Sequence, residues 1–170
     1  MATLRKGKCY SNVTRAYTRK SKFQKKGYIK AAPSSKIVRY NMGDTKKEFP
    51  KQFVLRAKAP VQVRHNAMES CRTLINRVLQ KRLGKDFLFK IVTYPHHILR
   101  ENKMLTGAGA DRMQSGMSHS FGKSAGLAVQ LKKDAVLFLV AVNEKDTQLA
   151  IEVLKMARPR IPGKFVVEEL

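Results

Sequence analysis

The chain has 170 residues, which lies within the size range of one domain and allows a buried hydrophobic core. Its 43% of hydrophobic residues argue against a wholly disordered protein, and its 35 Lys and Arg against 12 Asp and Glu leave a formal net charge of +23. A free protein with this excess repels itself, so a polyanionic partner is expected, and nucleic acid is favoured over membrane lipid.

The N-terminus and the cysteines indicate the cellular setting. Residues 1–9 lack the apolar stretch of a secretory signal, so an intracellular protein is expected; an Arg-rich transit peptide is the less favoured alternative. The longest apolar run, residues 135–142, is far shorter than the ~18 residues of a membrane span, so no membrane partner is expected. Cys9 and Cys71 form no CxxC pair or disulfide framework, which fits a reducing compartment.

Charge divides the chain into two parts. Residues 1–43 contain twelve Lys or Arg and no acid, whereas residues 144–170 hold five residues of each sign. We therefore predict a basic N-terminal arm over residues 1–43 that docks on the body and on RNA, followed by a single body over residues 44–170. The arm's aromatic residues either stack on bases or pack on the body, and a disordered tail is the alternative; these residues are Tyr10, Tyr17, Phe23 and Tyr28.

The first elements of the body are a strand and a helix. Alternating apolar residues predict one strand from Phe53 to Val63 that bends at Pro60. A helix follows, with Asn66 as its N-cap and a left-handed end at Gly84. Its predicted inner face consists of Ala67, Cys71, Leu74, Ile75, Val78, Leu79 and Leu83.

Four further elements complete the body. Phe87–Tyr94 reads as a buried strand, and residues 127–131 and 135–142 as a hairpin with a turn at 132–134. Asn143 is predicted to cap a second helix that ends before Pro159, with Leu149, Ala150, Val153, Leu154 and Ala157 facing inward. A final strand is expected over residues 164–168. This order predicts an α+β fold, a mostly antiparallel sheet with two helices on one side.

A long loop over residues 100–126 interrupts these elements. It contains five of the ten glycines, and Arg100, Lys103, Arg112 and Lys123 supply positive charge. Long loops without secondary structure are uncommon in compact domains and are usually functional or disordered. We expect a projecting loop that RNA orders; a flexible surface loop is the alternative.

Enzyme motifs are near misses. Gly122-Lys123-Ser124 resembles the end of a P-loop, but Met117 stands where the motif requires glycine. A dinucleotide fingerprint starting at Gly107 fails similarly at Arg112. The four histidines lack metal-ligand spacing, and Cys71 fits a core residue better than a nucleophile. No catalysis, metal or cofactor is therefore expected.

Four stretches carry a resemblance to a known family. They are YPHHILRENKML (94–105), AGADRMQSGM (108–117), FGKSAGLA (121–128) and ARPRIPGK (157–164). With them the chain resembles, over nearly its whole length, the universal large-subunit ribosomal protein family, called L-ten-e in archaea and eukaryotes and related to bacterial L-sixteen. Bacterial members have more Gly and Lys at Gln114–His119, so contacts there are expected to differ. The end at Leu170, without the longer eukaryotic extension, favours an archaeal source.

The resemblance implies an α/β-hammerhead type of fold on large-subunit rRNA near the aminoacyl-tRNA site. The loop is then expected to reach toward tRNA and the peptidyl transferase centre through Asn102, Lys103, Met104, Gly107, Ala108, Gly109, Ala110, Asp111 and Arg112. Implied partners are large-subunit rRNA, aminoacyl-site tRNA, neighbouring ribosomal proteins and assembly factors in the cytoplasmic ribosome, and no homo-oligomer is expected. A free-standing RNA-binding or regulatory protein remains the alternative.

Basic and histidine residues are the candidates for contact with rRNA. The residues expected to bind it are Arg5, Lys6, Lys8, Arg15, Arg19, Lys20, Lys22, Lys25, Lys26, Lys30, Arg64, Arg72, His96, His97 and Lys123.

Overall fold

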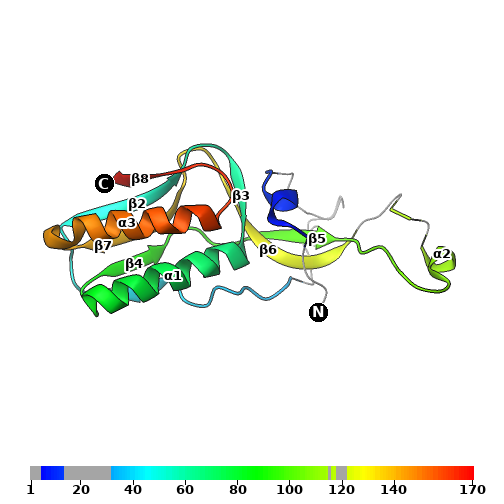
Figure 1. Cartoon of the computed structure of the whole chain (residues 1–170), viewed down its shortest axis with the longest axis horizontal. Coiled ribbons are helices and arrows are strands. Elements are labelled where there is room, and N and C mark those ends of the chain that lie inside the picture. The colour runs from blue at the N-terminus through cyan, green and yellow to red at the C-terminus, as the bar shows by residue number, and fades with distance from the viewer. Residues whose placement is uncertain (1–4, 14–31, 115, 118–121) are drawn as a thin grey trace, which may run out of the picture.

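Two antiparallel sheets form the framework of this computed structural model, which describes residues 5–13, 32–114, 116–117 and 122–170. The larger sheet has the strand order β1-β4-β7-β2-β8, with β1 (Asn41–Gly43), β4 (Leu88–Ile91), β7 (Val136–Val142), β2 (Lys51–Ala57) and β8 (Phe165–Glu169). The smaller sheet has the order β3-β6-β5, with β3 (Val61–Arg64), β6 (Lys123–Leu131) and β5 (His97–Glu101). In Figure 1 it lies to the right of the larger sheet.

Two long helices lie side by side on one face of the larger sheet (Figure 1). They are α1 (His65–Leu83) and α3 (Thr147–Ala157). Shorter elements are η1 (Gly7–Tyr10), α2 (Ala110–Met113), η3 (Glu144–Asp146) and η4 (Arg158–Arg160). The α+β class and the two helices on one side confirm the sequence prediction, but the strands form two sheets instead of one.

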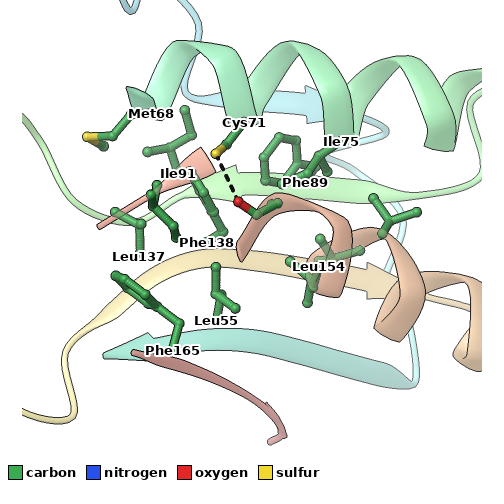
Figure 2. Close-up of a cluster of buried hydrophobic side chains, with 14 of the residues drawn as sticks. Leu55, Met68, Cys71, Ile75, Phe89, Ile91, Leu137, Phe138, Leu154 and Phe165 are labelled. Carbon is green, nitrogen blue, oxygen red and sulfur yellow. Dashed lines mark hydrogen bonds between the residues drawn. The ribbon is translucent and has the colours of Figure 1, made fainter. Parts of the chain in front are cut away.

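The hydrophobic core lies between these helices and the larger sheet (Figure 2). Phe89 of β4 and Phe138 of β7 meet edge to face, with ring centroids 5.7 Å apart, and both are fully buried. The predicted α1 face is confirmed at Cys71, Ile75 and Leu79, and Met68 is also buried there. Aromatic and β-branched strands under two amphipathic helices thus bury one continuous core.

Cys71 is a core residue, as predicted. Its thiol donates to the carbonyl oxygen of Ala157 at 3.5 Å, which links α1 to the last turn of α3 (Figure 2). Burial raises the pKa of the Cys71 thiol to about 12. Because the thiolate is the nucleophilic form, a neutral buried thiol is unsuited to catalysis.

The predicted strand from Phe53 to Val63 is wrong as a single element. It divides at residues 58–60 into β2, in the larger sheet, and β3, in the smaller sheet. The predicted hairpin is also wrong, because β6 pairs with β3 and β5 whereas β7 pairs with β2 and β4. Both chain segments cross between the sheets at one place, where Ala57 N–H donates to Ala135 O at 3.0 Å. A short turn in the sequence does not reveal this crossing.

Both predicted N-caps are wrong. α1 begins at His65 with Arg64 in the cap position, because β3 runs directly into the helix, and the Asn66 side chain bonds only to the N–H of Ala67. Asn143 instead precedes the 3₁₀ turn η3, and it makes no side-chain cap bond. The inner face of α3 is confirmed at Ala150, Val153, Leu154 and Ala157, and Gly84 ends α1 with φ 64°. The last strand starts one residue later than predicted, at Phe165.

Candidate RNA-binding surface

The described N-terminal segment, residues 5–13, docks on the smaller sheet. Gln62 of β3 donates its backbone N–H to Ser11 O at 2.9 Å and its side-chain amide to Tyr10 O at 2.8 Å. Arg64 donates to Arg5 O at 3.1 Å, and its guanidinium lies 5.4 Å from the Tyr10 ring centroid. Tyr10 is buried, so this aromatic residue of the arm packs on the body.

An ion pair connects this segment to the base of the long loop. Arg5 Nε lies 3.6 Å from Glu101 Oε1 at the end of β5, and the Glu101 side chain is only 9% exposed. Lys6 and Lys8 remain exposed beside it. The other predicted arm residues lie outside the described residues: Arg15, Arg19, Lys20, Lys22, Lys25, Lys26 and Lys30. The docking therefore directs the start of the basic arm to the base of the loop.

The described part of the loop between β5 and β6, residues 102–114, 116–117 and 122, extends away from both sheets (Figure 1). Its two limbs leave a strand pair whose last partners are Glu101 and Lys123. The backbone N–H of Leu105 donates to Gln114 Oε1 at 2.7 Å, which joins the limbs farther out, and α2 lies beyond that bond. Nearly all side chains from Lys103 to Arg112 are exposed. The structure thus brings the predicted loop residues together on one projecting element.

The remaining predicted residues are scattered. Arg72 contacts both Glu69 carboxylate oxygens, at 2.6 and 2.7 Å, so its charge is already engaged within the protein. His96 is exposed at the turn before β5, whereas His97 is 7% exposed within β5. Lys123 is exposed at the start of β6. These four residues do not form one continuous site.

Sequence reasoning missed two basic depressions beside α1. Both are lined by Arg72, Asn76 and Gln80, which recur at the four-residue spacing of one helical face. One depression, of about 380 Å³, is bordered by Arg77 and Lys81, and the other, of about 330 Å³, by Arg39 and Lys85. The signal available in the sequence was this spacing on the polar face, opposite the apolar one.

Comparison with known proteins identifies the family. A model described as ribosomal protein L16p/L10e matches residues 15–168. The chain belongs to this family. Its relatives named large ribosomal subunit protein uL16 include one from Methanococcus maripaludis, 42% identical over 161 residues that cover 94% of this chain and 90% of the relative. One from Methanosphaerula palustris is 39% identical over 168 residues, 96% of this chain and 94% of the relative.

Membership in the L16p/L10e family confirms the resemblance carried by the four motifs. It makes the chain a structural constituent of the large ribosomal subunit, located in the cytoplasmic ribosome, and not an enzyme. The local structure agrees at the near-miss P-loop, because Lys123 and Ser124 begin a strand where that motif requires a helix. Within the described residues, no three His, Cys, Asp or Glu side chains could together hold a metal ion. In the same part of the chain, no helix is long and apolar enough to cross a membrane.

Two buried histidines make the stability of this L16p/L10e protein pH-dependent. Desolvation lowers the pKa of His65 and of His97. Positive charge on Lys36 lowers the pKa of His65 further, and positive charge on His96 does the same for His97. A histidine whose pKa is lower in the folded than in the unfolded state contributes to the free energy of unfolding at pH values above the ordinary pKa of about 6.5. That contribution is lost as the pH falls below about 6.5 toward the pKa of the folded state.

We therefore expect a lower free energy of unfolding at about pH 5.5 than at about pH 7.5, a window above the carboxylate range. Urea denaturation at both pH values measures this difference. His97→Gln should reduce this difference most, whereas His96→Gln removes only the contribution of the neighbouring charge and should reduce it less. Equal stability at the two pH values would contradict the prediction.

Proposed function

We propose that the chain binds large-subunit rRNA near the aminoacyl-tRNA site and supports tRNA positioning and the peptidyl transferase centre. The proposal divides the chain into a basic arm over residues 1–43 and a body over residues 44–170 of the α/β-hammerhead type. In it, the arm neutralises rRNA phosphates, the body sets the orientation, and the loop between β5 and β6, shorter than the predicted 100–126, reaches toward tRNA. Neighbouring ribosomal proteins and assembly factors are the further proposed partners.

One observation carries this proposal: the docked N-terminal segment meets the base of the projecting loop. The Arg5–Glu101 pair joins them, and Lys6, Lys8 and Lys123 lie exposed near this junction. Basic side chains that come together from two separate elements are more typical of a phosphate-binding surface than of charged residues that are only solvated. The exposed Lys103 and Arg112 extend the same charge along the loop.

Sedimentation tests the proposal. Tagged chain expressed in cells should migrate with large ribosomal subunits and leave them only at high salt, because phosphate contacts are displaced by salt. Crosslinks from Lys103 and Arg112 should then map to rRNA near the aminoacyl-tRNA site. Accumulation in light fractions together with tight binding to short RNAs would instead favour a free-standing RNA-binding protein.

A further inference from the structure

The base of the loop holds a cavity that the proposed contacts leave unexplained. It has a volume of about 610 Å³, within the ~300–1,000 Å³ typical of small-molecule sites. Its lining comes from the end of β5, both limbs of the loop and the first residues of β6: Glu101, Asn102, Lys103, Leu105, Met113, Gln114, Lys123, Ser124 and Ala125. It therefore opens beside the exposed lysines.

The apolar part of this cavity is unusually exposed. Met113 is 82% exposed and Leu105 is 49% exposed, although both are large apolar side chains. They lie on opposite limbs, and the bond from Leu105 N–H to Gln114 Oε1 holds the limbs together beside them. Large apolar side chains that are exposed and line a cavity are more typical of a binding site than of an ordinary solvated surface. Methionine suits a flat partner because its thioether is polarizable and adapts its shape.

The polar part of the cavity can read an edge of a planar ligand. Gln114 accepts the Leu105 N–H through its oxygen, so its amide nitrogen is the group that it can offer a ligand as a donor. Asn102 and Ser124 add an amide and a hydroxyl to the same lining. Side-chain amide and hydroxyl groups form hydrogen bonds with the exposed edge of an unstacked base.

The charges around the cavity favour a ligand that carries phosphate. Lys103 and Lys123 are exposed at the cavity, whereas the Glu101 carboxylate is held by Arg5 and is only 9% exposed. An apolar floor, edge-reading amides and two flanking cations match a nucleobase with its phosphates. We propose that this cavity binds one unstacked RNA nucleotide, with the base between Leu105 and Met113 and the phosphates on Lys103 and Lys123. The inference rests on the proposed function, since it needs RNA beside the loop.

Site-specific photocrosslinking tests the proposal in assembled subunits. With p-benzoylphenylalanine in place of Met113, we expect crosslinks to one or two adjacent unpaired nucleotides. The matched control carries the same group in place of Met156, which is 50% exposed on α3 and lies outside the cavity. Crosslinks that form without tRNA assign the nucleotide to rRNA, and crosslinks that need tRNA assign it to tRNA; both support the site. Crosslinks from position 113 to a protein, to paired nucleotides, or to no RNA would overturn it.

Hairpin RNAs with and without one bulged nucleotide provide a second measurement on the full chain. We expect wild-type protein to prefer the bulged hairpin by about tenfold, as one base contact allows. Met113→Ala and Gln114→Ala should abolish the preference without weakening binding to the unbulged hairpin, whereas Gln148→Ala, on α3, should preserve it. Equal binding of the two hairpins by the wild-type protein would contradict the nucleotide site but not the proposed function. The proposed function fails only if the chain does not sediment with large subunits.

Discussion

Raising monovalent salt from about 50 to about 200 mM is expected to weaken binding of the chain to large-subunit rRNA by roughly four orders of magnitude. This figure assumes about eight neutralised phosphates, for which the logarithm of affinity falls with the logarithm of salt at a slope near −6 to −7. The physical reason is that a chain with a net charge of +23 displaces counterions that are condensed on the RNA. Filter binding of purified chain to an rRNA fragment over this range measures the slope.

Single substitutions separate phosphate contacts from general charge. Lys103→Ala, in the projecting loop, should reduce the magnitude of the slope by about 0.7 to 0.9. Lys155→Ala removes the same charge from α3, in the charge-balanced C-terminal region, and should leave the slope unchanged. A flat salt response of the wild-type chain, or equal effects of the two variants, would contradict phosphate-led binding by the loop.

Gly43→Ala is expected to lower the free energy of unfolding by about 3 to 5 kcal/mol. Gly43 ends β1 with φ 85°, and a Cβ atom there would lie 1.9 Å from the carbonyl oxygen of Phe87. The backbone at Phe87, directly before β4, cannot move at low cost, because the Asp44 N–H donates to the same oxygen at 2.8 Å. Strain and overlap therefore add. Chemical denaturation measures the loss.

Gly84→Ala is the matched control for that substitution. Gly84 also has a positive φ, 64°, but no atom lies within 4 Å of the position of an added Cβ. Only backbone strain remains, because φ 64° with ψ −101° is sparsely populated by residues other than glycine, so a loss of roughly 1 to 3 kcal/mol is expected. Similar losses in the two variants would show that the close approach of Gly43 to Phe87 does not limit stability.

Local patterns in the sequence determined the class of the protein and several elements. Charge is additive along a chain, so the +23 excess indicated a polyanionic partner without any knowledge of the fold. Helical periodicity is local too, which is why the buried faces of α1 and α3 were predictable from residues such as Ile75 and Val153. The family motifs likewise need only the order of residues.

The tertiary structure alone decided which elements meet. The Arg64–Arg5 bond spans 59 residues, and the crossing at Ala57 and Ala135 moves two chain segments between sheets, so turn signals misassigned the strands as one hairpin. The cavity at the base of the loop also depends on how side chains from separate elements are placed in space. Pairing between distant segments is set by mutual packing, which no local pattern encodes.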